Sequence, residues 1–234
     1  MPGLYPGGGN LQLSVIIPTM NEEESIGQVI DSVHHALRGW EYEVLVVDTN
    51  SKDRTRDIAA EKGAVVIDEP RRGYGRAYKT GFERSKGDVI ATLDADCTYP
   101  AEEIPALHKL LMDKDLEFIT TNRFAQLEEG AMTAKHRLGN FALTFVSNLF
   151  FGVRIKDSQS GMWVFRRGIL DRLVLSDDGM PMSEEIKIEA FRKVKSLEVP
   201  IAYRRRVGEV KLSSWKDGWK NMKFLFKKRF RGQR

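Results

Sequence analysis

The amino-acid sequence predicts an α/β fold in which a mostly parallel sheet is flanked by helices. Two observations lead to this prediction. Short apolar runs typical of buried strands alternate with helical segments through the first half of the chain. The chain has 234 residues, 41% of them hydrophobic and 30% charged, which is ample for one large soluble domain with a substantial core.

The expected elements follow one another in a regular order. Strands are predicted at residues 11–18, 43–48, 64–67, 89–93, 116–121, 162–165 and 198–203. Helices are predicted at residues 21–37, 55–62, 101–113 and 182–196. We expect a disordered lead-in at residues 1–10, one α/β domain at residues 11–212, and a basic amphipathic C-terminal helix at residues 213–234.

The composition excludes several classes of protein. A single cysteine cannot support an internal disulfide framework, which agrees with a reducing cytoplasm. The four histidines and the cysteine show no zinc-binding spacing. Residues 1–10 lack the basic and apolar regions of a signal peptide.

Two carboxylates one residue apart follow the apolar run at residues 89–93. Ligands of open α/β sheets bind beyond the carboxyl ends of the strands, and paired carboxylates there suit Mg²⁺ or Mn²⁺. Asp94 and Asp96 are therefore a candidate metal site. The alternative is a turn that ends the strand, with a helix cap at Asp96 or Thr98.

A basic loop punctuated by glycines spans residues 71–81 and leads into a helix. Its backbone N–H groups and Arg72 could hold phosphate oxygens. The spacing matches neither a P-loop nor a dinucleotide-binding fingerprint, so a plain capping turn is the alternative.

Two later segments have unusual composition. Residues 140–152 are almost wholly apolar but too short to span a bilayer, which takes about 20 residues. They are either a core helix or a helix that lines a groove facing lipid. Residues 203–234 hold 12 Lys and Arg against two acids, a net charge of +10, whereas residues 1–202 carry −6.

The C-terminal helix is predicted to be amphipathic. Its large apolar residues recur at helical spacing, namely Trp215, Trp219, Met222, Phe226 and Phe230. Lysines fall largely off this stripe, as in helices that lie on a membrane surface. Packing on the protein body and nucleic-acid binding are the two alternatives, and we favour membrane contact over both.

Several motifs, taken together in their order, resemble the family-2 glycosyltransferases, in particular the polyprenyl (dolichyl) phosphate sugar synthases. The resemblance extends over nearly the whole chain, from about residue 11 to 220. The matching pieces are Ile17-Pro-Thr-Met-Asn-Glu22, Val46-Val-Asp48 with Asn50-Ser51, Arg72-Gly-Tyr-Gly75, Leu93-Asp-Ala-Asp96, Arg123, Arg137 with Asn140, Asp157 with Ser160-Gly161, and Arg206, Gly208 and Lys211-Leu212.

This resemblance implies a GT-A fold, a nucleotide-diphosphate-sugar donor, a polyprenyl or dolichyl phosphate acceptor and Mg²⁺ or Mn²⁺. Asp94 and Asp96 would hold the metal and the diphosphate. The residues implied to hold the nucleoside are Pro18, Thr19, Asn21, Glu22, Asp48 and Asn50. Those implied to hold phosphates are Arg123 and Arg137 (the acceptor phosphate), Arg206 and Lys211.

The sequence also departs from the family pattern. Thr98 stands where many synthases have Gln or His, and it is a poorer metal ligand. Thr121-Asn122 replaces the common Gly-Ser before Arg123. Many relatives carry transmembrane helices after the catalytic domain. Here we expect peripheral contact with the cytoplasmic face of a membrane, through residues 213–234 and, as a second candidate, residues 140–152.

The implied reaction inverts the anomeric carbon and needs no strong base. A phosphate monoester, with a second pKa of about 6, is already largely dianionic at neutral pH. A hydroxyl acceptor on a soluble glycan or protein would instead need a base, for which Asp157, Glu184 and Glu185 are candidates. A nucleotide-binding protein that is non-catalytic or transfers a nucleotidyl group is the other alternative.

The motifs do not identify the base or the sugar of the nucleotide-sugar donor. Residues 158–163 and 183–189 are similar to archaeal members that act in protein N-glycosylation, which favours a UDP-sugar over GDP-mannose.

Overall fold

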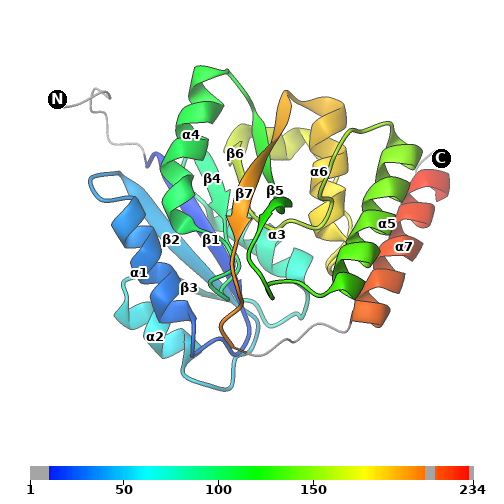
Figure 1. Cartoon of the computed structure of the whole chain (residues 1–234). Coiled ribbons are helices and arrows are strands. Elements are labelled where there is room, and N and C mark those ends of the chain that lie inside the picture. The colour runs from blue at the N-terminus through cyan, green and yellow to red at the C-terminus, as the bar shows by residue number, and fades with distance from the viewer. Residues whose placement is uncertain (1–10, 209–213, 232–234) are drawn as a thin grey trace.

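One seven-stranded sheet organises the computed structural model, which describes residues 11–208 and 214–231 (Figure 1). Its strand order is β3-β2-β1-β4-β6-β5-β7. The strands are β1 (Leu13–Thr19), β2 (Tyr42–Asp48), β3 (Val65–Asp68), β4 (Val89–Thr92), β5 (Phe118–Leu127), β6 (Trp163–Arg166) and β7 (Ser196–Tyr203). The helices are α1 (Ile26–Ala36), α2 (Thr55–Glu61), α3 (Tyr74–Arg84), α4 (Ile104–Asp113), α5 (Ala134–Phe151), α6 (Met182–Lys193) and α7 (Ser214–Arg231), with short 3₁₀ turns η1 (Ala101–Glu103) and η2 (Arg167–Arg172).

The first four strands are parallel, as predicted. β1 lies in the middle, with β2 on one side and β4 on the other, so the chain reverses its winding direction between β1 and β4. Such a switch point opens a crevice at the carboxyl ends of the strands. The chain segments that follow β1 and β4 therefore meet at one edge of the sheet.

β6 is the exception, since it runs antiparallel to both β4 and β5. This orientation brings the turn before β6 alongside the end of β4, where the Thr92 hydroxyl donates to the carbonyl of Gly161 at 2.7 Å. The sequence predicted the strand but not its direction. The turn at residues 157–161 consequently becomes part of the site edge.

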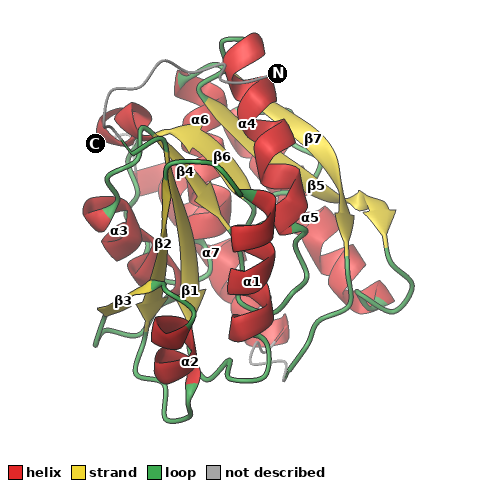
Figure 2. Cartoon of the chain, turned by 90° about the vertical axis from the view of Figure 1, so that its left-hand side faces the viewer, coloured by secondary structure: helices red, strands yellow, loops and turns green. Residues whose placement is uncertain are grey.

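Helices cover both faces of the sheet, which explains the nearly continuous apolar strands (Figure 2). Successive residues of β1 point to opposite faces: Val15 and Ile17 pack in the cluster that includes α1 and α4, whereas Ile16 packs with α3 and α6. All three side chains are fully buried. The doubly wound prediction is confirmed.

Some element boundaries differ from the prediction. Asn21 has a positive φ of 54°, so the first helix begins at Ile26 rather than at residue 21. The helix predicted at 182–196 ends at Lys193 because Val194 is extended. β5 continues beyond residue 121, since it pairs with β7 as far as Leu127.

α5 and α7 lie side by side at one end of the molecule, at the right of Figure 1. They share a small core in which Leu143 of α5 meets Ile188 of α6 and Phe224 and Leu225 of α7. Packing on the body, one of the three uses considered for the C-terminal segment, is thus present in the structure. α5 is not a core helix throughout, because Phe141, Phe145 and Leu149 are exposed.

No helix in the described part of the chain is both long and apolar enough to cross a membrane.

Candidate active site

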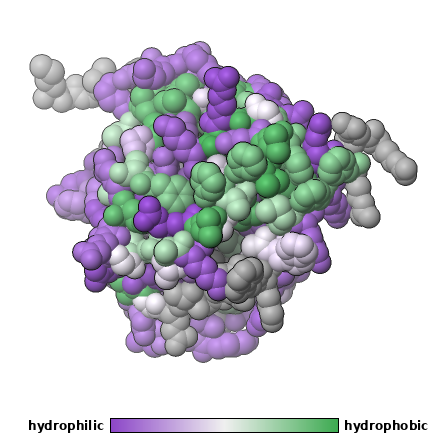
Figure 3. Space-filling view, turned by 45° about the vertical axis from the view of Figure 1, so that its right-hand side comes forward, coloured by the Kyte–Doolittle hydropathy of each residue, from purple (hydrophilic) through white to green (hydrophobic). Residues whose placement is uncertain are grey.

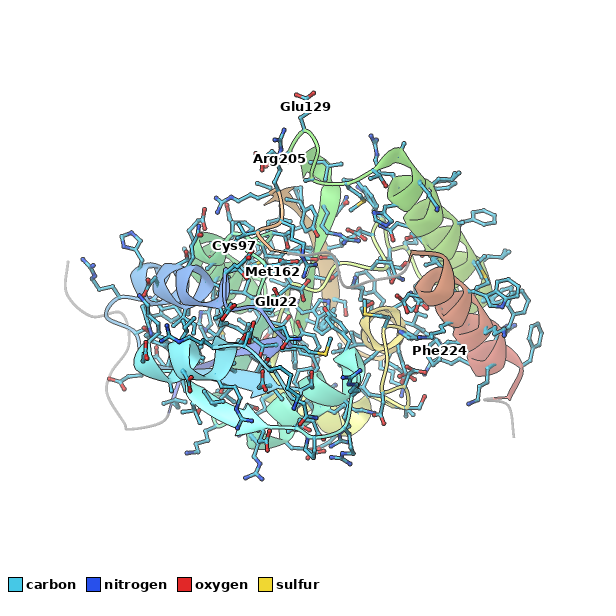
Figure 4. All side chains as sticks on the ribbon, turned by 90° about the horizontal axis from the view of Figure 1, so that it is seen from below. Glu22, Cys97, Glu129, Met162, Arg205 and Phe224 are labelled. Carbon is cyan, nitrogen blue, oxygen red and sulfur yellow. The ribbon has the colours of Figure 1, made fainter. Side chains whose placement is uncertain are left out.

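A cavity of about 660 Å³ opens at the carboxyl ends of β1 and β4. In Figure 4, Glu22 and Phe224, which both line it, come from opposite sides: Glu22 from the segment after β1 and Phe224 from α7. The predicted site residues that line it are Pro18, Thr19, Glu22, Arg72, Asp94, Asp96, Arg123 and Arg206. The fold thereby brings together residues that are up to 188 positions apart, from Pro18 in β1 to Arg206 after β7.

Asp94 sits where its negative charge is costly. Burial, together with the like charge of Asp96, raises the pKa of the Asp94 carboxyl to about 7. The Tyr74 hydroxyl donates to Asp94 Oδ1 at 3.0 Å and partly offsets this effect. Gly161 keeps the space open, since a Cβ there would lie 2.4 Å from the Tyr74 oxygen and 3.2 Å from the Asp94 oxygens.

Asp96 uses its two oxygens differently. Oδ1 accepts from the backbone N–H and the hydroxyl of Thr98, at 3.1 and 2.6 Å. Oδ2 lies 3.1 Å from Nη1 of Arg206. Thr98 therefore orients Asp96, which lines the cavity. The turn considered as the alternative is present, but neither Asp96 nor Thr98 caps a helix, because the N-cap residues of η1 and α4 are Pro100 and Glu103.

Arg206 bridges two carboxylates at the cavity wall. Its guanidinium lies 3.1 Å from Glu22 as well as 3.1 Å from Asp96. The segment after β7 is held in place because the Val207 N–H donates to the carbonyl of Asp96 at 2.9 Å. Arg206 thus supplies positive charge beside the carboxylate pair.

Asp48, Asn21 and Asn50 support the cavity rather than line it. Asp48 is fully buried and accepts from the hydroxyl groups of Thr19 and Ser51. The Asn21 side-chain oxygen accepts from the backbone of Lys52 at 2.7 Å. Asn50, in the left-handed conformation at φ 64°, donates to the carbonyl of Pro70 at 2.8 Å. These bonds tie the loops after β1, β2 and β3 together.

Arg123 is buried in an ion pair while also reaching the cavity. Nε and Nη2 donate to the two oxygens of Asp157 at 2.7 and 2.9 Å, and the guanidinium lies 5.2 Å from the centre of the Tyr203 ring. The Arg123 charge lowers the pKa of Asp157 against the opposing effect of its burial. Lys187 donates to the Asp157 carbonyl at 2.9 Å.

The three carboxylates considered as general bases are all buried and bonded within the protein. Asp157 pairs with Arg123, Glu184 accepts from the Gln159 amide at 2.9 Å, and Glu185 lies 3.0 Å from Lys228. Burial raises the pKa of Glu184 well above its usual range. None of the three lines the cavity.

The arginines of the basic loop at residues 71–81 have two different roles. Arg71 and Arg76 both bind the buried carboxylate of Glu69, while Arg72 lines the cavity. Gly73, at φ 151°, approaches another loop so closely that a Cβ would lie 2.2 Å from the carbonyl oxygen of Asp178. The glycine pattern thus serves close packing at the start of α3.

Two remaining predicted site residues are not among the described residues that line the cavity. Arg137 is exposed in the first turn of α5 and does not line the cavity. Lys211 lies outside the described residues.

The model of the family described as glycosyl transferase family 2 matches residues 14–174. The chain belongs to this family. It is 42% identical over 217 residues to a low-salt glycan biosynthesis hexosyltransferase, Agl6, of Haloferax volcanii, covering 91% of this chain and 52% of the relative. It is 33% identical over 206 residues to a dolichyl-phosphate hexose transferase of the same organism, covering 88% of this chain and 89% of the relative.

The chain thus spans about half the length of Agl6 but most of the second relative. Among solved structures, glucosyl-3-phosphoglycerate synthase from Mycobacterium tuberculosis in complex with Mn²⁺, UDP and glucosyl-3-phosphoglycerate superposes with a TM-score of 0.76. The sequences are 21% identical, and the match covers 94% of this chain and 80% of that one. This likeness confirms the GT-A fold of the family-2 domain.

The cavity is also lined by residues for which the sequence indicated no site role. These are chiefly Tyr74, Gln159 and Asp177, together with five residues of α7, namely Asp217, Lys220, Lys223, Phe224 and Lys227. Tyr74 stood inside a recognised motif, but its contact with Asp94 depends on how α3 packs against the sheet. The α7 lysines were assigned only to membrane contact, because the docking of α7 cannot be read from its periodicity.

The donor set suits a divalent cation. Asp94 and Asp96 offer hard oxygen ligands. The pKa of Asp94 is raised by burial and then by the like charge of Asp96, and a cation would offset the negative charge that both effects disfavour. Within residues 11–208 and 214–231, no group of three or more His, Cys, Asp or Glu side chains forms a metal cluster. Mg²⁺ commonly binds through one or two carboxylates together with substrate phosphates.

Proposed function

We propose that this family-2 protein is an inverting glycosyltransferase that moves a sugar from a nucleotide-diphosphate sugar to a polyprenyl or dolichyl phosphate at a membrane surface. The name of one relative, dolichyl-phosphate hexose transferase, supports this class of acceptor. The structural observation that carries the proposal is an exposed apolar surface beside the cavity, on the two helices that pack together at one end of the molecule.

This surface, the α5–α7 apolar face, consists of Leu138, Phe141, Phe145, Leu149, Phe226 and Phe230. Its side chains are between 47% and 70% exposed, although they are large and hydrophobic. Figure 3, which turns the right-hand side of Figure 1 forward, shows hydrophobic residues gathered there. Phe150 joins the two helices, with its ring centre 5.0 Å from that of Phe226. Contiguous apolar surface of this kind favours contact with a membrane or a lipid chain.

The donor would bind across the ends of β1 and β4. Pro18, Thr19 and Glu22 line the cavity above the buried Asp48, in a position suited to the nucleoside. Arg72 and Arg206 would face the diphosphate. Within this proposal we favour a UDP-sugar over GDP-mannose. The transfer would serve glycan biosynthesis, the process that the name of the relative Agl6 states.

Asp94 and Asp96 would hold Mg²⁺ or Mn²⁺. When bound, the cation would neutralise charge on the leaving nucleoside diphosphate. Tyr74 and Thr98 keep the two carboxylates oriented through their hydroxyl groups. Arg206 would add a second positive charge from the same side.

The acceptor in this proposal carries its own nucleophile. A phosphate monoester is largely dianionic at neutral pH, so positioning and charge stabilisation replace base catalysis. Arg123, fixed by Asp157, would orient the acceptor phosphate from the cavity wall. Attack from the side opposite the leaving diphosphate predicts inversion at the anomeric carbon.

A hydroxyl acceptor on a soluble glycan or protein is the second candidate. It would require a base, and the three carboxylates considered for that role are buried and bonded within the protein. This observation favours the phosphate acceptor. Nucleotidyl transfer is a third candidate, distinguished by the release of pyrophosphate rather than a nucleoside diphosphate.

The proposal is tested by incubating the protein with labelled UDP-glucose, UDP-N-acetylglucosamine or GDP-mannose, polyprenyl phosphate and Mg²⁺. We expect label in the organic-solvent extract and release of nucleoside diphosphate. Asp96→Asn should lower the rate by about 10²-fold or more because a charge that organises the transition state is lost. Asp88→Asn, before β4 at the opposite end of the strand, is the matched control and should keep full activity.

Three results would contradict the proposal. Label confined to the aqueous phase would indicate a soluble acceptor, and pyrophosphate release would indicate nucleotidyl transfer. Full activity of Asp96→Asn with metal still required would remove Asp96 from the site. Thermal unfolding of each variant separates these outcomes from misfolding.

A further inference from the structure

One wall of the cavity is a row of lysines on α7. Lys220, Lys223 and Lys227 all line the cavity, and they are spaced by three and four residues. Residues at this spacing lie on one side of an α-helix. The cavity therefore has a basic wall on α7 in addition to the carboxylates Asp94 and Asp96 that follow β4.

The orientation of this wall is fixed by buried contacts of α7. Leu225 is fully buried in the small core shared with α5 and α6. The Asn221 amide donates to the side-chain oxygen of Gln159 at 2.8 Å, and Gln159 itself lines the cavity. Lys228 lies 3.0 Å from Glu185 and 2.9 Å from Glu189. The row therefore cannot turn away from the cavity without breaking these contacts.

The lysines of α7 fall into two groups with different surroundings. Lys228 is compensated by two carboxylates that are almost completely buried. In the row, Lys220 lies 3.3 Å from Asp217, and the Lys223 ammonium lies 5.6 Å from the centre of the Trp219 ring. Among the described residues, neither Lys223 nor Lys227 forms an ion pair with a carboxylate. The wall therefore carries positive charge available to an anionic ligand.

The position of the row on the helix identifies the kind of anion. At 3.6 residues per turn, Lys223 and Lys227 lie between the buried side of α7 and the exposed side that carries Phe226 and Phe230. A ligand held by the row would thus have its charge at the cavity and its remainder beside exposed aromatic side chains. An anionic head on an apolar chain matches this arrangement.

We infer that Lys223 and Lys227, with Lys220, form a subsite for the phosphate monoester of the acceptor. This inference rests on the proposed function and assigns the row to substrate binding inside the cavity rather than to membrane lipid headgroups. The α7 row would bind the acceptor phosphate as it enters the cavity, and Arg123, near the sheet, would orient it for the reaction. The donor diphosphate and lipid headgroups are the two other sources of the same phosphate chemistry.

The test uses citronellyl phosphate, a short water-soluble isoprenoid phosphate, as acceptor in the absence of vesicles. Lys223→Gln with Lys227→Gln should raise the KM for citronellyl phosphate by about tenfold or more, the expected loss of a charge-assisted contact. The KM for the nucleotide sugar should stay unchanged. Lys223→Arg with Lys227→Arg should recover most of the affinity, because both positive charges return.

Arg229→Gln is the matched control. It removes one positive charge from the same helix at an exposed position that does not line the cavity. Its KM for citronellyl phosphate should equal that of the wild type. Binding of each variant to phosphatidylcholine vesicles containing one quarter phosphatidylglycerol is measured in parallel.

The outcomes separate this inference from the proposed function. An unchanged KM for citronellyl phosphate in the double Gln variant overturns the inference while transfer by the wild type stands. In that case a raised donor KM assigns the row to the diphosphate, and weakened vesicle binding assigns it to lipid headgroups. Failure of the wild type to transfer sugar to either citronellyl or polyprenyl phosphate overturns the proposed function, and the inference falls with it.

Discussion

At the residue scale, the site depends on charges that the chain buries in a connected group. Arg123, Asp157 and Lys187 come from β5, the turn before β6, and α6, and all three are almost completely buried. Arg123 holds both oxygens of Asp157, and Lys187 binds the carbonyl of the same residue. Removing one member of a buried pair usually costs more than the pair contributes. These residues therefore fix the part of the cavity wall that Arg123 lines.

Lys187 gives this group a measurable pH dependence. Burial lowers the pKa of Lys187 to about 7, while the Asp157 charge opposes the shift. Between about pH 7 and pH 10.5 the unfolded chain keeps the proton that the folded protein has released, so folding becomes more favourable as the pH rises. The stability of the wild type relative to Lys187→Met should therefore increase from pH 7.5 to 9.5, by up to about 1.4 kcal/mol per pH unit.

Urea unfolding of both proteins at the two pH values measures this difference. Lys86→Met removes an exposed lysine and serves as the control, for which no comparable increase is expected. A stability difference for Lys187→Met that is the same at both pH values would show that Lys187 stays charged in the folded protein.

Sequence reasoning at this scale found the residues that follow strands and missed those that depend on tertiary packing. Asp94, Asp96 and Glu22 were found because strand ends meet at one edge of a doubly wound sheet. Gln159 was not, because its bonds to Asn221 and Glu184 join three segments that are remote in sequence. Thr98 is a different case, because its bond to Asp96 is local and the sequence already indicated a turn there with Asp96 or Thr98 as a cap.

At the element scale, α7 has three differently used sides. Periodicity predicted one apolar stripe, and Phe226 and Phe230 of that stripe are exposed. The buried side instead contains Asn221 and Lys228 beside Leu225, because Gln159, Glu185 and Glu189 provide polar partners. A hydrophobic pattern cannot reveal a buried side that is partly polar. It also could not give the direction of β6, which a strand's own sequence does not encode.

The attachment of α7 is tested by Leu225→Ala. Deleting a fully buried leucine side chain costs about 2–5 kcal/mol, and this loss should fall mainly on the docking of α7. Amide hydrogen exchange should become faster along α7 and remain slow in β1. Arg229→Ala, at an exposed position of the same helix, is the matched control and should leave exchange in α7 nearly unchanged. Equal exchange in wild type and Leu225→Ala would mean that other contacts alone hold the helix.

At the scale of the whole molecule, the cavity and the α5–α7 apolar face share one helix. The row of Lys220, Lys223 and Lys227 borders the cavity, and Phe226 and Phe230 lie on the exposed side of α7. A lipid-linked acceptor that contacts the face would thus have its phosphate within reach of the cavity. This arrangement predicts that transfer to an acceptor in a bilayer requires the α5–α7 apolar face, whereas transfer to an acceptor free in solution does not.

The double variant Phe145→Ser with Leu149→Ser tests this difference. Both side chains are more than half exposed, so their removal should leave the thermal unfolding temperature almost unchanged. Burying one large apolar side chain contributes about 1.5–3 kcal/mol, so losing two should weaken vesicle binding by at least about tenfold. Transfer to polyprenyl phosphate in vesicles should fall accordingly, while the KM for soluble citronellyl phosphate should not change.

Val65→Ser is the matched control, because Val65 is an exposed apolar residue on β3, at the far edge of the sheet. This variant should bind vesicles as the wild type does. If the double variant bound vesicles as the wild type does, the α5–α7 apolar face would not be the membrane contact, and a protein partner would be the better explanation for its exposure.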